Sequence, residues 1–201
     1  MRPVSLIKGA MLPLPRANVD TDQIMPKQFL KRVERTGYGE YLFWDWRRTR
    51  GGELDPEFVL NQSRYQDAKV LVAGPNFGSG SSREHAPWGL QDWGFEAVIA
   101  PSLADIFRTN CTKIGLLPIQ LPAAEVSLLT RLATESPESR VTIDLESQTV
   151  ETPGLSTTFE IDPFTKWRML NGYDDIGLTL RHLAEIDAFE LTRSRVLPSL
   201  K

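Results

Sequence analysis

Short apolar runs alternate with longer amphipathic stretches through the middle of the chain. The runs are rich in β-branched residues and predict buried strands over 68–74, 96–100 and 116–121. Apolar spacing between them predicts helices over about 83–94 and 103–112. The resulting order of strand, loop, helix, strand, helix and strand is typical of an α/β fold.

Residues with special backbone preferences mark the ends of these elements. Ser102 is placed to cap the start of the second helix, and Gly115 to end it. Pro118 cannot donate a ladder hydrogen bond, so the last strand is expected at a sheet edge or to end there.

The first and the last third of the chain predict different kinds of structure. The first third looks loop-rich, with a turn-forming cluster at 18–22. An aromatic run at 41–46 leads into an arginine-rich stretch, which suggests either packing on the core or a surface for a partner or substrate. The last third predicts a hairpin of 141–145 with 149–151, a strand over 157–161, and helices over 163–171 and 175–192, with Gly172 as a helix end.

Composition narrows the class of protein. The chain has 201 residues, of which 41% are apolar and 24% are charged, a composition typical of globular proteins. Since a domain has about 150 residues on average, we expect a single domain over 1–201. The net charge of −3 argues against nucleic-acid binding. No apolar run approaches the ~18 residues of a membrane span, and the N-terminus does not resemble a secretory signal. We therefore expect a cytoplasmic protein that binds neither nucleic acid nor membrane.

The single cysteine, Cys111, limits redox and metal chemistry. One thiol cannot form an internal disulfide or build a cysteine cage for a metal or cluster. This fits a reducing compartment. Cys111 is expected to be a small buried core residue.

The segment that carries chemistry is the Gly/Ser loop after the first buried strand of the middle region. It lies at the carboxyl end of that strand, where open α/β sheets bind ligands. Gly78 and Gly80 allow positive φ and close approach of the backbone. The following helix N-terminus favours an anion, and Arg83 adds a fork for a carboxylate or phosphate beside the Ser81 and Ser82 hydroxyls.

The same residues also allow a purely structural interpretation. Ser81 and Glu84 have the spacing of a helix capping box, and His85 could be a structural histidine. The loop is neither a Walker motif nor Gly-x-Gly-x-x-Gly, and it does not match the Gly-x-Ser-x-Gly nucleophile turn. Nucleotide binding and serine hydrolysis are therefore disfavoured.

Residues 78–86 resemble the signature of the small, or swivel, domain of the aconitase superfamily, Gly-x-Gly-Ser-Ser-Arg-Glu-His-Ala. Further segments look like the small subunits of bacterial isopropylmalate isomerases, and the likeness extends over about residues 1–195. These segments are 18–24, 26–30, 86–88, 99–102, 104–107 and 167–180.

The resemblance implies an aconitase-like swivelling β/β/α domain and a partnership with a large subunit that holds a four-iron–four-sulfur cluster. The complex would isomerise 2-isopropylmalate to 3-isopropylmalate through 2-isopropylmaleate in leucine biosynthesis, and this chain alone would be inactive. The single cysteine agrees, since the cluster must then lie on another chain. No cofactor or metal is expected on this chain.

The resemblance also implies roles for the loop residues. Ser81 would be the general base, and Ser82 and Arg83 would bind a substrate carboxylate. We place Glu84 and His85 behind them, orienting the loop. Asp20, Thr21 and Lys27 match a motif near the cleft without a role that the sequence assigns, and an apolar wall for the isopropyl group is expected within 29–38.

The sequence leaves two rival functions open. A sister hydro-lyase for homoaconitate or a methylated malate would carry much the same loop, although the chain length favours the leucine-pathway form. A dicarboxylate-binding module without catalysis would be a different class, and the intact Ser81, Ser82 and Arg83 argue against it.

Overall fold

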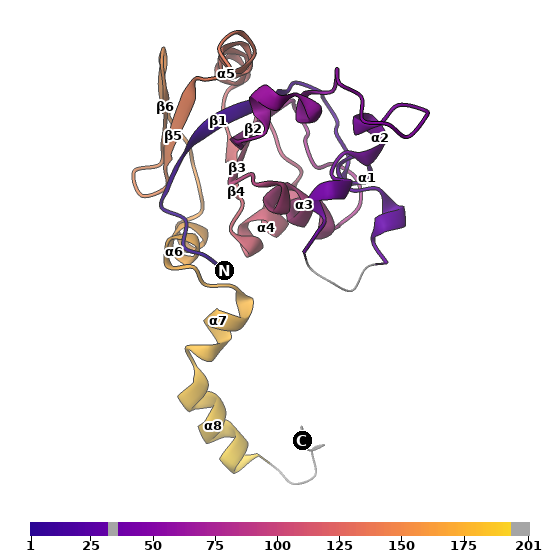
Figure 1. Ribbon diagram of the computed structural model, residues 1–201. Helices are drawn as coiled ribbons and strands as arrows, with labels where there is room; N and C mark the ends of the chain where they lie inside the picture. The colour runs from indigo at the N-terminus through magenta and orange to yellow at the C-terminus, as the bar shows by residue number, and fades with distance from the viewer. Residues whose placement is uncertain (32–35, 194–201) are drawn as a thin grey trace.

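The computed structural model describes residues 1–31 and 36–193, in which helices pack on both faces of a seven-stranded mixed sheet (Figure 1). The strands are β1 (Leu6–Leu14), β2 (Ala68–Ala73), β3 (Ala97–Ala100), β4 (Leu117–Gln120), β5 (Arg140–Asp144), β6 (Thr149–Thr152) and β7 (Leu155–Thr158). Their order across the sheet is β4-β3-β2-β1-β5-β6-β7. β1 to β4 pair in parallel, and β5 to β7 continue the sheet from β1 in antiparallel fashion.

Short helices and turns fill the first third, and longer helices follow. The helices are α1 (Thr21–Ile24), α2 (Trp44–Arg47), α3 (His85–Trp93), α4 (Asp105–Ile114), α5 (Ala123–Glu135), α6 (Pro163–Asn171), α7 (Asp175–Leu180) and α8 (Leu183–Thr192). Single 3₁₀ turns occur at η1 (Lys27–Phe29), η2 (Gly39–Tyr41), η3 (Val59–Asn61) and η4 (Ser63–Tyr65).

The sheet separates two hydrophobic cores. Successive residues of β2 point to opposite faces, so Leu71 packs with α3 and α4, whereas Val70 and Val72 pack with α5 and α6. Cys111 lies fully buried in the first core, as predicted. This three-layer arrangement confirms the α/β prediction.

The expectation of a loop-rich first third was wrong for its opening residues. β1 is an inner strand, parallel to β2 and antiparallel to β5. Gly9 and Pro13 weaken the sequence signal for this strand, because both residues are unfavourable in a regular strand. Gly9 sits where a Cβ would overlap the Lys69 side chain, and Met11 and Leu12 are completely buried. Burial between two neighbouring strands therefore overrides the weak local preference.

Most of the predicted helices are present, with some changes at their ends. Gly115 and Gly172 end α4 and α6 in the left-handed conformation, as expected. Ser102 does not cap α4, which begins at Asp105. Instead, Oγ of Ser102 accepts a hydrogen bond from the backbone N–H of Asn76 at 2.8 Å.

Other local predictions had mixed outcomes. The hairpin became β5 and β6, and Pro118 lies on the edge strand β4, as predicted. The strand expected over 157–161 is β7, which ends at Thr158. The helix expected over 175–192 is divided into α7 and α8, and α5 was not anticipated.

Within the aromatic run at 41–46, Leu42 and Phe43 are completely buried, so this part packs on the core.

The loop between β2 and α3 passes closely over α4. Gly78 has a φ of +76°, and a Cβ there would overlap the Phe107 ring. Phe107 is itself buried and lies edge-on to Phe77, with ring centroids 5.4 Å apart. Gly78 therefore combines a backbone requirement with a packing requirement.

We predict that Gly78→Ala lowers the free energy of unfolding by about 2–4 kcal/mol, of which positive φ accounts for ~1–2 kcal/mol and overpacking for the rest. Gly154 is a matched control, since its φ is +83° and nothing lies within 4 Å of the Cβ position. Gly154→Ala should cost only the backbone part. Urea unfolding of both variants measures the difference, and equal losses would contradict an overlap with Phe107.

Candidate active site

Three loops meet where the inner parallel strands end. The segment after β1 bridges the segment after β2 at Asp20 and Ser79, and the segment after β2 bridges the one after β3 at Phe77 and Leu103. Because parallel strands deliver their following loops to one edge, the Gly/Ser loop lies between two neighbours. The sequence prediction that this loop follows a buried strand is confirmed.

Backbone hydrogen bonds fasten the Gly/Ser loop to the segment after β1. The Val19 carbonyl accepts from the Gly78 amide at 2.8 Å and from the Ser79 amide at 3.2 Å. The Thr21 amide in turn donates to the Ser79 carbonyl at 2.8 Å. Gly80, at φ +90°, then turns the chain toward Ser81, as the sequence predicted for a positive-φ glycine.

Thr21 adds a side-chain contact to this brace. Its Oγ1 donates to the Ser81 carbonyl at 2.9 Å, and the residue is 2% exposed. The contact joins residues 60 positions apart and holds the backbone of the serine that the resemblance singles out. Thr21 therefore gains a role that its sequence context did not assign.

Asp20 and Gln23 form the capping box that starts α1. The Asp20 carboxylate accepts a hydrogen bond from the backbone N–H of Gln23 at 2.7 Å, and the side-chain oxygen of Gln23 accepts one from the backbone N–H of Asp20 at 3.0 Å. An Asp followed three residues later by Gln is a sequence signal for such a box, and it could have been identified beforehand. Lys27 lies exposed at the start of η1, apart from these contacts.

Ser81 is presented to solvent rather than used as a helix cap. Helix α3 begins at His85, its N-cap residue is Glu84, and no side chain caps it. The capping box between Ser81 and Glu84, which the sequence allowed as a structural alternative, is therefore not formed. Ser81 and Ser82 are exposed, and the Ser81 hydroxyl makes no hydrogen bond to any residue that the structure describes.

Arg83 lies beside the two serines with a carboxylate already in contact. Its NH1 forms an ion pair with Oδ1 of Asp22, on helix α1. The Arg83 side chain is 17% exposed and that of Asp22 is 50% exposed, so the guanidinium is held at the rim of the loop. Asp22 was not singled out from the sequence.

His85 lies among aromatic rings at the start of α3. Its ring centroid is 5.3 Å from that of Tyr38 and 4.7 Å from that of Trp88. Partial burial lowers the pKa of His85 from its ordinary value, the neighbouring Glu84 opposes this, and Arg83 adds to it. The imidazole is therefore mostly neutral at pH 7. Glu84 itself is exposed.

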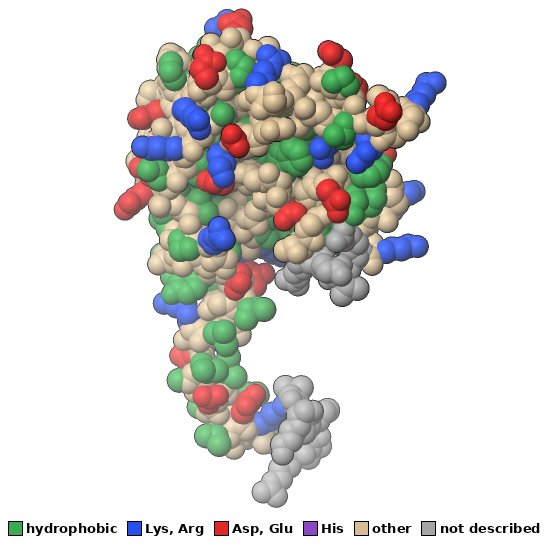
Figure 2. Space-filling view, in the orientation of Figure 1, with side chains coloured by type: hydrophobic (Ala, Val, Ile, Leu, Met, Phe, Trp, Pro, Cys, Tyr) green, Lys and Arg blue, Asp and Glu red, His purple; other side chains and the backbone are tan. Residues whose placement is uncertain are grey.

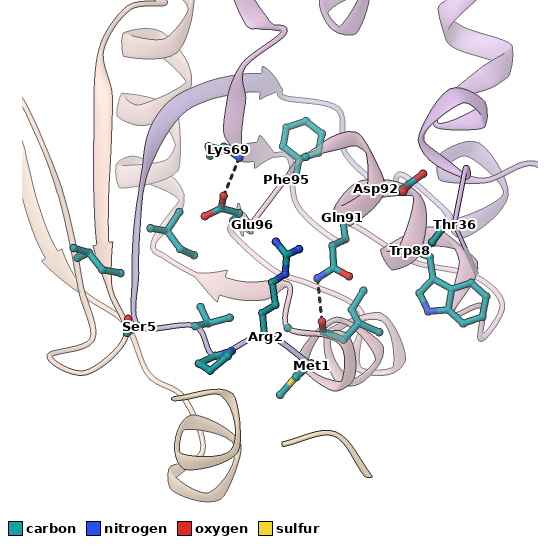
Figure 3. Close-up of a pocket in the computed structure, with 17 residues that line it drawn as sticks. Met1, Arg2, Ser5, Thr36, Lys69, Trp88, Gln91, Asp92, Phe95 and Glu96 are labelled. Atoms are coloured by element: carbon teal, nitrogen blue, oxygen red, sulfur yellow. Dashed lines mark hydrogen bonds and ion pairs between the residues drawn. The ribbon is translucent and has the colours of Figure 1, made fainter. Parts of the chain in front are cut away.

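A separate groove of about 660 Å³ lies at the other end of the sheet (Figure 3). Lys69 and Glu96, near the amino ends of β2 and β3, form an ion pair of 2.9 Å in its wall, and Gln91 donates to the Ile114 carbonyl at 3.0 Å. Ser81 and Arg83 do not line it. Ligands of α/β sheets bind at the carboxyl ends of strands, so we place the candidate site at the Gly/Ser loop.

The chain's residues do not fit an iron–sulfur cluster. Cys111 is the one cysteine in the sequence, and burial raises the pKa of its thiol well above the ordinary value, which disfavours the thiolate ligand. Among the described residues, no group of three or more His, Cys, Asp or Glu is arranged to hold a metal ion.

In the described part of the chain, none of the helices has the length and apolar character needed to cross a membrane.

The comparisons with known proteins agree with this geometry. A family model described as the aconitase C-terminal domain matches residues 1–124, and a model for the C-terminal domain of the 3-isopropylmalate dehydratase small subunit matches residues 175–200. The chain is 56% identical over 198 residues to a protein of Rubrobacter xylanophilus named 3-isopropylmalate dehydratase small subunit, covering 98% of each chain. A protein of the same name from Frankia alni is 51% identical over 199 residues, covering 99% of each.

The fold is also similar to a solved structure. The crystal structure of 3-isopropylmalate dehydratase from Methanocaldococcus jannaschii superposes with a TM-score of 0.66 at 27% identity, covering 91% of this chain and 99% of the other. The fold class expected from the resemblance is thereby confirmed. The chain belongs to the family of 3-isopropylmalate dehydratase small subunits, within the aconitase superfamily.

Proposed function

We propose that this chain is the catalytic-loop half of a hydro-lyase that interconverts 2-isopropylmalate and 3-isopropylmalate through 2-isopropylmaleate in leucine biosynthesis. It acts with a large subunit and is inactive alone. The observation that carries the proposal is the exposed Ser81 hydroxyl, held on a braced loop beside Arg83 in a chain of this family. We propose further that residues 1–201 act as one domain in the cytoplasm.

Ser81 acts as the general base. Dehydration removes a weakly acidic proton next to a carboxylate, and an alkoxide is strong enough for this step but costly in water. A nearby cation and N–H donors stabilise the alkoxide and lower the pKa of the hydroxyl. Arg83 supplies such a cation, and the absence of a capping role leaves the Ser81 hydroxyl available for the substrate.

Arg83 and Ser82 bind a substrate carboxylate. The contact with Asp22 uses NH1 of Arg83, which leaves the Nε–NH2 edge for a bidentate contact. Asp22 thus fixes the fork before substrate arrives. Glu84 and His85 support the loop from behind, with His85 anchored among Tyr38 and Trp88.

We assign acceptance of the departing hydroxyl to the large subunit, where we expect the four-iron–four-sulfur cluster to reside. The open face of the loop supports this division, since Gly80, Ser81 and Ser82 are all exposed and a second chain can cover them. The apolar wall for the isopropyl group stays a prediction. Phe29 of that segment stacks on Tyr41 at 4.2 Å, and residues 32–35 lie outside the described part of the chain.

We predict that anaerobic reconstitution with the cluster-bearing large subunit gives hydration of 2-isopropylmaleate that requires both chains. In that complex, Ser81→Ala should lower kcat by about 10²–10⁴-fold with little change in KM, because it removes the proton acceptor. Ser82→Ala should instead raise KM.

Three outcomes of this assay would contradict the proposal. Near-normal kcat in Ser81→Ala would show that the serine is not the base. Turnover of homoaconitate or a methylated malate, but not of isopropylmaleate, would assign the chain to a sister hydro-lyase, and substrate binding without turnover would indicate a binding module.

We predict that Thr21 positions Ser81. Thr21→Val keeps the shape but removes the donor to the Ser81 carbonyl, and should lower kcat about fivefold, the loss expected from a hydrogen bond of ~1 kcal/mol. Thr21→Ser keeps the donor and should restore most of kcat.

A control for Thr21→Val is available on the other side of the sheet. Thr134→Val removes a similar bond, of 2.8 Å to the Thr130 carbonyl in α5, and should leave kcat unchanged. Steady-state kinetics of the three complexes measure the effect. Equal kcat values in the two valine variants would refute a positioning role for Thr21.

A further inference from the structure

The two last helices extend away from the body of the structure as an arm (Figure 1). We call residues 175–193, which include α7 and α8, the C-terminal arm. Neither helix contains a buried residue. Large apolar side chains are nevertheless concentrated on it, and green side chains follow its length in Figure 2. These are Ile176, Leu180, Leu183, Phe189 and Leu191, between 51% and 88% exposed.

The apolar positions of α8 are spread around the helix rather than along one face. They are Leu183, Ala184, Ile186, Ala188, Phe189 and Leu191. A helix that lies on a protein surface carries one apolar stripe, whereas a helix that is apolar on all sides is normally buried. The pattern therefore fits a partner that surrounds α8, such as a groove, better than a flat contact.

The root of the arm is attached to the body by specific polar contacts. Arg168, on α6, is 8% exposed and donates through NH1 to Oδ1 of Asp175 at 3.0 Å, and through NH2 to Oγ1 of Thr112 at 3.4 Å. Asp174 caps α7 through the Gly177 amide at 2.7 Å. The arm is thus directed by the fold rather than being a loose tail.

The extent of the family models indicates which partner the arm meets. The aconitase C-terminal domain model ends at residue 124, and the arm lies entirely within the match over 175–200 to the model that is specific to small subunits. The arm therefore belongs to the part of the chain that distinguishes a separate small subunit from the shared domain. A segment specific to separate subunits is suited to hold the other subunit.

Charge on α8 favours a different chain over a second copy. Glu185, Asp187 and Glu190 lie between its apolar positions, and no Lys or Arg lies within α8. Two such helices packed together would bring like charges into contact, which costs free energy. A partner groove rimmed by Lys and Arg would match them.

We propose that the C-terminal arm attaches this chain to the large subunit, with α8 inserted into an apolar groove of that subunit rimmed by basic residues. This inference rests on the proposed function, because it takes the large subunit as the partner.

The test measures the Kd between the full-length chain and the cluster-bearing large subunit by calorimetry. Leu183 on the arm and Leu54 on the body are 51% and 52% exposed, so Leu183→Asp and Leu54→Asp are matched. We expect Leu183→Asp to raise Kd at least tenfold and Leu54→Asp to change it less than twofold. Circular dichroism checks that both variants remain folded.

A second variant tests the charge of the groove. Asp187→Lys should raise Kd at low salt and weaken its dependence on ionic strength, since rim charges act through screened attraction. Kd values that match wild type in both arm variants would overturn the proposal. So would an isolated chain that self-associates through the arm, if Leu183→Asp breaks that association and leaves the Kd for the large subunit unchanged.

Failure of the arm proposal is distinguishable from failure of the proposed function. A tight wild-type complex that Leu183→Asp weakens, but that does not turn over isopropylmaleate, would support the arm and contradict the reaction. A complex that turns over normally and tolerates the arm variants would contradict the arm alone. Absence of any wild-type complex would overturn both.

Discussion

The parallel pairing of β1, β2 and β3 is the constraint on which the functional face depends. Parallel neighbours carry their following loops to the same edge of the sheet, so three separate stretches of sequence must meet there. The bridges from Asp20 to Ser79 and from Phe77 to Leu103 are the direct result. Without β1 in its inner position, the Gly/Ser loop would lose the segment that holds it.

This constraint explains how an exposed serine can be well positioned. Ser81 projects into solvent, yet its backbone carbonyl is held by the buried Thr21, and the loop below it is fixed by two amides on the Val19 carbonyl. Hydrogen bonds to the backbone thus hold the loop in place, and the Ser81 hydroxyl stays available. An open loop whose backbone is held in this way suits one half of an active site that a second chain completes.

Folding and the proposed association with the large subunit use different regions of the molecule. The body buries its apolar residues in two cores on either side of the sheet, whereas the C-terminal arm leaves its apolar side chains exposed. The division is built into the chain at Gly172, whose left-handed conformation ends α6, and at Arg168, which orients the root of α7. A chain that met no partner would have little reason to expose such a helix.

Sequence alone determined the α/β class of the middle region, the glycine helix ends, the edge position of Pro118 and the family signature over 78–86, because periodicity, backbone preference and a short motif are local properties. Tertiary structure alone decided that β1 is an inner strand, that Ser81 is not a cap, and that Thr21 and Asp22 hold the loop and Arg83. These features depend on contacts between residues far apart in the chain, and pairing at such distances leaves no periodic or local mark on the sequence.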